Sequence, residues 1–482
     1  MNDTPEEIQF ALISHTNAGK TTLARTLTGV DVGEVRDAPH VTALSESHVL
    51  FSTPSGDVLK LWDTPGFGDS VRLFKRLSMS GNPIGWFLRE VIDRFRDRPF
   101  WLSQQALRTA RDAADVVLYL VNSSEDPRDA GYLASEMQIL QWLRKPVVVL
   151  LNQMGPPRPF IEEQAEQARW KEALAVYGVV QKVIALDAFA RCWVHERVFY
   201  EAVGELISAP KKDAYARLFK AWEQENEVRF HAAMKLTAQQ IASAARDSEA
   251  VEAADGAGLG TVLDAIGLGK QRDRKRHDKA MKALMGRLNE GIADTTAALL
   301  KLHRLDAGAA ARINERVHKG FVVRAPVDTR QAGLLGAIVS GAATGLSADL
   351  MAGGLTLGAG ALLGGVVGAM TFASAAWAFN AKTDRNEPRV QFSDEFLRTM
   401  VVTGLLRYLA VVHFGRGRGN FVEGEAPLFW QQEVESAVAL NENALAEAWR
   451  AARTGADSDG AALEESLTRT ASQVLHKLYP RP

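Results

Sequence analysis

The chain has 482 residues, a formal net charge of −2 and an ordinary globular composition. This length exceeds one hydrophobic core, so we expect roughly two to four domains. The balanced charge gives no reason to expect nucleic acid as a partner. The single cysteine, Cys192, excludes an intrachain disulfide framework, and a buried structural thiol is its expected role. The first residues, MNDTPEEIQF, lack the parts of a signal peptide, so the N-terminal half is expected to stay in the cytoplasm.

The stretch LISHTNAGKTTL joins a predicted buried strand, residues 8–13, to a predicted helix that begins in residues 21–27. A phosphate-binding loop needs this context, because backbone N–H groups at a helix start attract phosphate. Lys20 would reach the β- and γ-phosphates, and the Thr21 hydroxyl would bind magnesium. Ser14 stands where the first glycine is usual, and it can replace that glycine if its backbone angles are open to other residues. The alternative is an ordinary helix start with a solvated lysine.

A second motif, VLKLWDTPGFGD, predicts an apolar strand followed by a tight turn. The Asp63 carboxylate at the strand end could hold magnesium through water, and the Gly66 N–H could meet the γ-phosphate. Between the two motifs, Thr42 in APHVTALSES stands where a switch threonine could close on magnesium. A plain turn after a strand is the alternative, but the order of the motifs favours a nucleotide site.

With these motifs, residues 8–205 resemble GTPases of the TrmE and Era type, since PHVT looks like their first switch and DTPG matches their third motif. The resemblance implies an α/β P-loop G domain with a mostly parallel sheet flanked by helices, GTP and GDP as ligands, and Mg²⁺ as cofactor. Asn17 matches the asparagine that helps hold a monovalent cation in potassium-stimulated members, which adds K⁺ as a candidate cofactor. Phe67 stands where other GTPases carry the glutamine that positions water. Hydrolysis is therefore expected to be slow without a cation, a partner or a dimer.

The base-reading motif departs from this family. After the predicted strand PVVVLL the family shows Asn-Lys-x-Asp, whereas this chain has NQMG, from Asn152 to Gly155. The missing aspartate matters, because a carboxylate that accepts from guanine N1 and N2 selects guanine over adenine. The next predicted strand, in KVIALDAFA, ends at Asp187 and Ala188, where the family's Ser-Ala-Lys loop lies beside the base. We expect Asp187 to supply the displaced carboxylate, with a helix-capping aspartate as the open alternative.

The motifs and the resemblance together assign three sets of site residues. Nucleotide binding falls on Asn17, Ala18, Gly19, Lys20, Thr21, Thr22, Asn152, Asp187 and Ala188. Catalytic roles fall on Lys20, Thr42 and Gly66. The magnesium ligands are Thr21, Thr42 and Asp63.

The chain between the second motif and the strand at Val116 is longer than a compact G domain needs. It contains IGWFLREVIDRFRDRPFW, which on a helix would present one apolar face. That face consists of Ile84, Phe87, Leu88, Val91, Ile92 and Phe95. A stripe of this kind is usually core, and a nucleotide-dependent contact surface is the alternative.

Beyond the G domain, predicted at residues 1–208, the pattern is helical and charged over 209–325, with two long candidate helices. An apolar, glycine-rich stretch follows at 326–385, and further amphipathic helices at 386–482. Between Arg330 and Lys382 the only charged side chain belongs to Asp349.

The glycine-rich stretch is predicted to form a membrane hairpin. Glycines at four-residue spacing allow helices to approach closely in a bilayer. Residues 332–348 and 355–379 would form two arms with Asp349 in their connection, since a span needs about 20 apolar residues. Basic residues on both sides favour two ends in the cytoplasm. These are Arg324, Arg330, Lys382, Arg385 and Arg389. A glycine-packed helix pair inside a soluble domain is the alternative.

The whole arrangement resembles an uncharacterised bacterial GTPase family with a C-terminal domain of unknown function. The sequence therefore predicts a GTPase switch at the cytoplasmic face of the bacterial inner membrane, with membrane lipid and either a second copy or an unknown protein as partners. Two alternatives stay open: a membrane-remodelling or pore-like protein with nucleotide-controlled assembly, and a soluble nucleotide-binding adaptor in the cytoplasm.

Overall fold

The computed structural model forms two compact units. The first comprises Met1–Val228, Val412–Gly424 and Leu478–Pro482, and the second Arg229–Val411 and Glu425–Lys477. Within these ranges the structure describes residues 5–15, 18–29, 45–79, 81–89, 92, 97–155, 158–187, 192–250, 268–305, 377–380, 389–413, 428–457 and 459–480.

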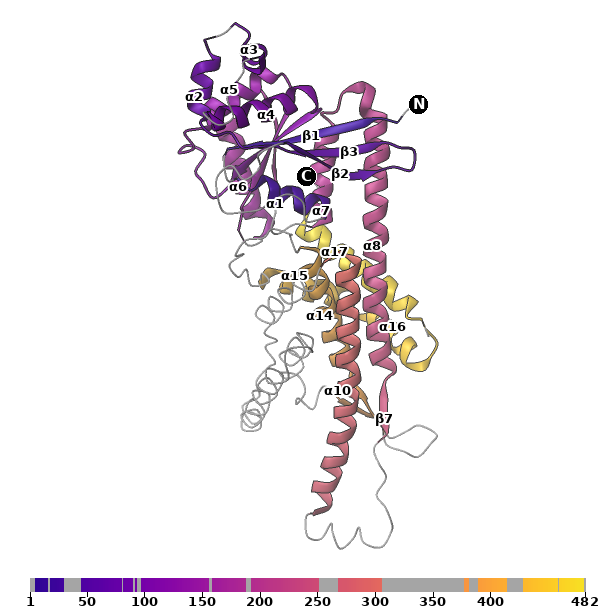
Figure 1. Ribbon diagram of the computed structural model, residues 1–482. Coiled ribbons are helices and arrows are strands. Elements are labelled where there is room, and N and C mark those ends of the chain that lie inside the picture. Colours follow the sequence, from indigo (N-terminus) through magenta and orange to yellow (C-terminus); the bar gives the residue numbers. More distant parts are fainter. Residues whose placement is uncertain are drawn as a thin grey trace. The chain divides into compact units, whose positions relative to one another are not determined.

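The first unit is built on a six-stranded sheet with the strand order β2-β3-β1-β4-β5-β6 (Figure 1). The strands are β1 (Glu7–Ser14), β2 (Glu46–Ser52), β3 (Val58–Asp63), β4 (Val116–Asn122), β5 (Val147–Asn152) and β6 (Val180–Ala185). Strand β2 is antiparallel to β3, and every other pairing is parallel. The register pairs Leu12 with Asp63 and Asn122 with Asn152, so the carboxyl ends of the central strands lie at one edge. The predicted α/β fold with a mostly parallel sheet is confirmed.

Helices cover both faces of this sheet (Figure 1). They are α1 (Lys20–Thr28), α2 (Ser70–Leu77), α3 (Pro83–Arg89), α4 (Arg98–Asp112), α5 (Leu133–Leu143), α6 (Phe160–Leu174), α7 (Trp193–Gly204) and the first turns of α8 (Lys212–Arg246), which follows the short helix η1 (Ala209–Lys211). Successive side chains of a strand point to opposite faces. In β1, Ala11 and Ile13 accordingly pack with helices α2 to α6, whereas Phe10 and Leu12 pack with α1, α7 and α8.

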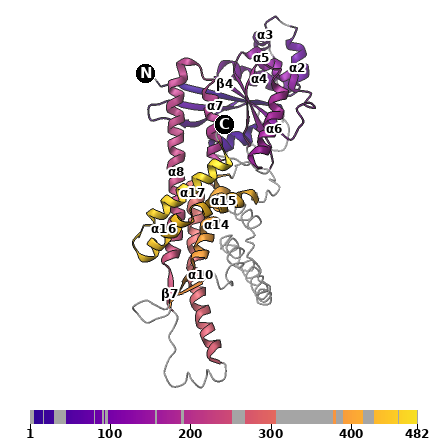
Figure 2. The ribbon, with the colours of Figure 1, turned by 180° about the vertical axis from the view of Figure 1, so that it is seen from behind.

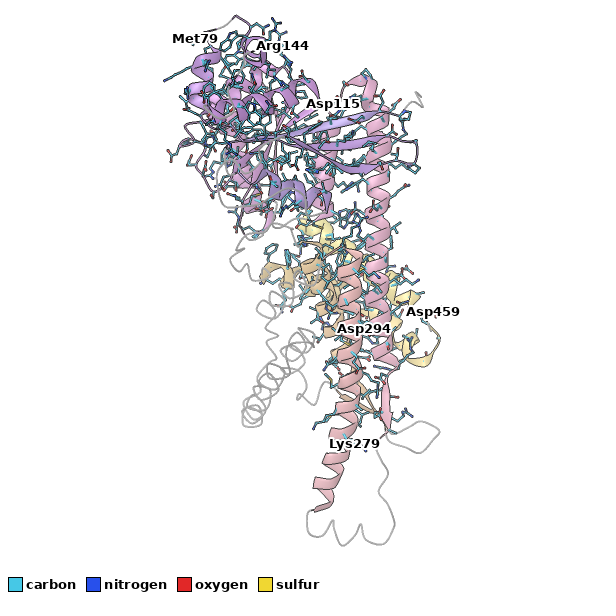
Figure 3. The ribbon with its side chains drawn as sticks, in the orientation of Figure 1. Met79, Asp115, Arg144, Lys279, Asp294 and Asp459 are labelled. Carbon is cyan, nitrogen blue, oxygen red and sulfur yellow. The ribbon has the colours of Figure 1, made fainter. Side chains whose placement is uncertain are left out.

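The stretch IGWFLREVIDRFRDRPFW within the insert belongs to two helices rather than one. Helix α3 ends at Arg89, and α4 begins at Arg98 with proline in its first turn, a position where the fixed proline backbone favours a helix start. Ile84, Phe87 and Leu88 are buried as predicted, and Ile92 packs partly buried against the same cluster. Val91 and Phe95 lie outside the described residues. Met79, which follows α2 and is labelled in Figure 3, is 81% exposed.

The second unit is mainly helical (Figure 2). It contains the rest of α8, α10 (Leu268–Leu302), α14 (Asp394–Val412), α15 (Leu428–Leu440), α16 (Glu442–Thr454) and α17 (Ala461–Leu478). A small antiparallel sheet joins β7 (Ser248–Ala250), β9 (Arg389–Phe392) and β8 (Trp377–Asn380). Phe230 of α8 contacts Tyr408 of α14 with ring centroids 5.7 Å apart. The two long helices predicted from the sequence correspond to α8 and α10.

Most of the glycine-rich segment, up to residue 376, lies outside the described residues. The end of its predicted second arm is strand rather than helix, because residues 377–379 lie in β8 and pair with β9. Arg407 lies in the mainly apolar helix α14 and is buried, which lowers the pKa of this residue to about 10. No helix in the described part of the chain is long and apolar enough to cross a bilayer.

Candidate functional site

The phosphate loop begins at Ser14, the buried last residue of β1, and ends at Gly19, next to the first residue of α1. Gly19 has a φ of +89°, a conformation that other residues rarely adopt. A Cβ atom there would lie 2.6 Å from Nδ2 of Asn152, so the position also requires glycine for space. The N-cap residue of α1 is Gly19, which has no side chain to cap the helix, and the amides at a helix start attract phosphate.

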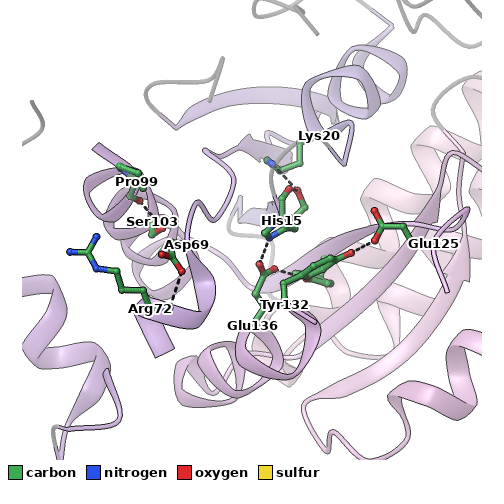
Figure 4. Close-up of polar contacts among 11 residues, drawn as sticks. His15, Lys20, Asp69, Arg72, Pro99, Ser103, Glu125, Tyr132 and Glu136 are labelled. Atoms are coloured by element: carbon green, nitrogen blue, oxygen red, sulfur yellow. Dashed lines mark hydrogen bonds and ion pairs between the residues drawn. The ribbon is translucent and has the colours of Figure 1, made fainter. Parts of the chain in front are cut away.

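The Lys20 side chain lies over this loop (Figure 4). Its ammonium donates a hydrogen bond of 2.7 Å to Oγ of Ser14, and the residue is 8% exposed. Burial lowers the pKa of Lys20 to about 8, while the nearby Asp63 and Glu136 carboxylates oppose that shift. The negative charges nearby therefore do not fully offset the cost of burying the ammonium, as expected for a group that binds phosphate.

Thr21 and Asp63 meet at the carboxyl end of the sheet. The Thr21 hydroxyl donates to Oδ2 of Asp63 at 2.5 Å. The other carboxylate oxygen, Oδ1, is buried and has no hydrogen-bond partner among the described residues. Burial raises the pKa of Asp63, whereas the hydrogen bond from Thr21 and the charge of Lys20 lower it. A hydroxyl and a carboxylate oxygen without a partner are the oxygen donors that Mg²⁺ prefers, so these residues fit the ion.

The turn after β3 is hydrogen-bonded to the end of β1, where the phosphate loop begins. The Thr64 hydroxyl donates to the carbonyl of Leu12, and the Phe67 N–H donates to the carbonyl of Ser14 at 3.0 Å. Gly66, between them, is buried. The Phe67 ring is 0% exposed and belongs to the hydrophobic core. This ring is buried and carries no hydrogen-bonding group, so it cannot position a water molecule as a glutamine would.

The residues predicted to read the base, Asn152 and Asp187, lie at the ends of β5 and β6. Nδ2 of Asn152 donates to the carbonyl of Ala18 at 2.8 Å, which ties this strand end to the phosphate loop. Oδ2 of Asp187 accepts from the N–H of Met154 at 2.6 Å. Asp187 thus holds the NQMG turn, and the N-cap residue of α7 is Cys192. Cys192 is buried, as expected.

The structure describes all but three of the predicted site residues. Asn17, Thr42 and Ala188 lie outside the described residues. Ala18 and Thr22, on either side of Gly19, Lys20 and Thr21 in the chain, are buried. The remaining site residues lie together at the carboxyl end of the sheet.

Sequence reasoning missed two residues beside the loop, His15 and Glu136. His15 Nδ1 lies 2.7 Å from Oε1 of Glu136 (Figure 4). The histidine occupies a variable position of the phosphate-loop motif, and the glutamate lies in an ordinary amphipathic helix. No local sequence signal could have paired them.

Two family models match separate parts of the chain. Residues 9–153 match the family described as 50S ribosome-binding GTPase, and residues 171–478 match the family described as domain of unknown function DUF3482. No curated protein matches the chain.

Among solved structures, the chain is similar to Era in complex with MgGDPNP and nucleotides 1506–1542 of 16S ribosomal RNA, at 15% identity over 59% of this chain and 90% of that chain, with a TM-score of 0.30. It is also similar to an Era variant of Aquifex aeolicus bound to GDP and AlF4⁻, at 13% identity over 58% of this chain and 90% of that chain, with a TM-score of 0.29. A bacterial selenocysteine-specific elongation factor is 15% identical over 44% of this chain and 29% of that chain, with a TM-score of 0.26.

Proposed function

The chain belongs to the DUF3482 family, and we propose that it is a membrane-associated GTPase that alternates between GTP- and GDP-bound states. Its N-terminal part is a P-loop GTPase domain. The observation that carries the proposal is the meeting of Lys20, Thr21 and Asp63 at the end of the phosphate loop. The buried Lys20 ammonium, whose pKa is lowered, would be stabilised by the negative charge of a phosphate. The Asp63 oxygen that has no partner among the described residues would be satisfied by a magnesium ion.

In the bound state, Lys20 would contact the β- and γ-phosphates, and the amides of Gly19 and the first turn of α1 would complete the cradle. Thr21 and Asp63 would hold the magnesium ion, with Thr42 as the switch residue that closes on it. When bound, the ion neutralises charge on the phosphate oxygens. The Gly66 N–H would contact the γ-phosphate, and this contact would tell GTP from GDP.

Guanine selection is assigned to Asn152 and Asp187. Support comes from the place of both side chains at the loops after β5 and β6, next to the phosphate loop. In this proposal one oxygen of Asp187 holds the turn at Met154, and its negative charge favours the N–H groups of a guanine edge over the adenine edge.

Slow intrinsic hydrolysis follows from the buried ring of Phe67. Another group must place the attacking water, and we assign this to K⁺ held near Asn17, to a second copy of the chain or to a protein partner. The switch would then act when one of these completes the site.

Membrane association is proposed for residues 332–376, without the three residues of the expected second arm that lie in β8, and is supported by their composition and basic flanks. The chain would lie at the cytoplasmic face of the bacterial inner membrane. Fractionation of cells that express the full chain, or the chain without 332–376, tests this assignment. We expect the full chain with the membranes and the deletion variant in the soluble fraction. Equal partitioning of the two would remove the anchor and leave a GTPase without it.

The nucleotide assignment is tested by calorimetry of the full chain with GTP, GDP and ATP in the presence of Mg²⁺. We expect binding of both guanine nucleotides, weaker binding of ATP, and loss of all binding in Lys20→Ala. Lys182→Ala is the matched control, because Lys182, on β6 and outside the site, forms an exposed ion pair with Glu205. Unchanged GDP affinity in Lys20→Ala would show that the loop does not bind phosphate.

A further inference from the structure

A buried carboxylate lies directly beside the phosphate loop. Glu136, in the first turn of α5, is 0% exposed. Both of its oxygens have partners, because His15 Nδ1 lies 2.7 Å from Oε1 and the Tyr119 hydroxyl donates to Oε2 (Figure 4). A buried charge without partners is strongly unfavourable, and a carboxylate in the first turn of a helix is further stabilised by the helix dipole. The site is thus built to keep a carboxylate next to His15.

The His15 ring is also fixed from its flat side. It stacks on Tyr132 with ring centroids 4.2 Å apart and an interplanar angle of 11°. The Tyr132 hydroxyl donates in turn to Oε2 of Glu125 at 2.8 Å (Figure 4). A hydrogen bond in the ring plane and a stacked neighbour together leave the imidazole one orientation.

The backbone of His15 pairs with Phe67, the last residue of the proposed second switch, which comprises residues 63–67. His15 forms a parallel β-bridge with Phe67, whose N–H donates to the Ser14 carbonyl at 3.0 Å. Phe67 directly follows Gly66, the proposed γ-phosphate contact. Because the ring of Phe67 is buried and its backbone is paired with the loop, a displacement of His15 shifts Gly66 as well.

We propose that the His15–Glu136 pair is a positioning element that keeps the second switch, residues 63–67, in register with the phosphate loop and thereby sets the preference for GTP over GDP. This inference rests on the proposed function, since it concerns the same nucleotide site. The pair acts through the backbone of residues 15 and 67 and touches no nucleotide itself. GDP lacks the γ-phosphate that Gly66 would contact, so loss of the pair weakens GTP binding and leaves GDP binding nearly intact.

Three variants separate this role from simple packing. Glu136→Gln removes the charge with little change in shape. His15→Phe keeps a ring to stack on Tyr132 but removes the nitrogen that faces Glu136. His15→Asn retains an N–H donor near the place of Nδ1, so it should restore part of the function. Glu205→Gln is the matched control, because it makes the same chemical change in an exposed ion pair with Lys182.

The dissociation constants of GDP and of a non-hydrolysable GTP analogue are measured with Mg²⁺ on the full chain. In Glu136→Gln and His15→Phe we expect the analogue to bind roughly tenfold more weakly, the effect typical of one charge-assisted hydrogen bond, and GDP to change less than about twofold. His15→Asn should lie between these variants and the unmutated chain. Equal weakening of both nucleotides, an unchanged ratio in folded variants, or loss of the fold in both disruptive variants would overturn the proposal.

Amide hydrogen exchange in the nucleotide-free chain gives a second readout that needs no ligand. The Phe67 amide, which donates to Ser14, should exchange faster in Glu136→Gln and His15→Phe than in the unmutated chain or in Glu205→Gln. If the unmutated chain bound no guanine nucleotide, the proposed function would fail, whereas this exchange measurement would still test the positioning role. Unchanged protection of Phe67 in both variants would refute that role by itself.

Discussion

The Arg217 guanidinium donates two hydrogen bonds to the carboxylate of Asp57, from Nε to Oδ2 at 2.8 Å and from Nη2 to Oδ1 at 2.9 Å. Asp57 lies in the turn that connects β2 to β3 and is 0% exposed, and Arg217 lies in the first turns of α8. The turn between β2 and β3 is thus fixed to the start of α8. A bidentate arginine–carboxylate pair is both strong and geometrically specific.

Asp57→Asn is expected to destabilise the first unit by roughly 3 kcal/mol, the lower end of the range for a broken buried pair, because Arg217 retains some contact with water. The measurement is the free energy of unfolding by denaturant, followed by near-UV circular dichroism. Asp112→Asn, at an exposed carboxylate paired with the adjacent Arg111, is the control and should change stability little. Equal stability of the two variants would contradict the structural role of the pair.

The same pair predicts a pH dependence. Arg217 holds the pKa of Asp57 below its ordinary value of 3.8. A carboxyl group with a lowered pKa contributes stability above its unfolded-state pKa, and this contribution is lost as the pH falls toward the folded-state pKa. The stability difference between the unmutated chain and Asp57→Asn should therefore stay constant above about pH 5 and shrink below about pH 4. A difference that is constant across this range would contradict the assignment.

Nucleotide binding is expected to take up a proton at Lys20. In the free protein burial holds the pKa of this ammonium near 8, and phosphate favours its charged form. Near pH 8 about half of the free molecules are deprotonated at Lys20, so binding of Mg-GDP should take up about half a proton. Calorimetry in buffers of different ionisation enthalpy measures this uptake. It should vanish for Lys20 at roughly pH 6, where the free ammonium is already charged.

Lys182→Ala serves as the control for proton uptake, since its exposed side chain lies outside the site. It should show the uptake of the unmutated chain. A binding enthalpy near pH 8 that does not depend on the buffer would mean that Lys20 is already fully charged before the nucleotide binds.

The parts of the site that are local in sequence could be predicted. The phosphate loop and DTPG turn are short motifs whose residues are close along the chain, and the strand-to-helix context around Lys20 was evident from hydrophobic patterning. The meeting of Thr21 with Asp63 followed from the motif order, because parallel strands bring their carboxyl ends to one edge. A hydrogen bond of 2.5 Å joins the two side chains.

The relationships that depend on tertiary packing could not be predicted. His15 and Glu136 are 121 positions apart, and their contact depends on the place of α5 beside β1 and β4, which no motif encodes. The contact of Asp187 with the Met154 amide depends in the same way on the pairing of β5 with β6. The break between α3 and α4 was missed because the apolar period continues across it, although proline in the first turn of α4 was a signal for a helix start.

Guanine preference is expected to depend on Asp187 despite the glycine at position 155. Asp187→Asn can still accept from the Met154 amide through its carbonyl, so the turn should persist while the negative charge is lost. We expect the ratio of ATP to GTP dissociation constants to fall by roughly tenfold or more, because a base-edge hydrogen bond to a charged acceptor is removed. Competition binding with both nucleotides measures the ratio.

Asp112→Asn again provides the matched exposed control and should keep the selectivity of the unmutated chain. Unaltered selectivity in Asp187→Asn would leave this aspartate as a support for the turn alone. Equal affinity of the unmutated chain for GTP and ATP would contradict guanine preference itself.

Hydrolysis of GTP is expected to be slow and to be faster in potassium than in sodium. The ring of Phe67 is buried in the core, so the residue at the usual glutamine position supplies no hydrogen bond to water. We propose that Asn17 helps to hold a monovalent cation, which would stabilise charge that develops on the transferring phosphoryl group. Phosphate release is measured at saturating GTP and equal ionic strength in the two salts, with Asn17→Ala for comparison. We expect roughly tenfold acceleration by potassium, typical of one added electrostatic contact in the transition state, and its loss in Asn17→Ala. Identical rates in the two salts would instead assign water positioning to a second copy of the chain or to a partner, and a rate that rises with protein concentration would then identify the second copy.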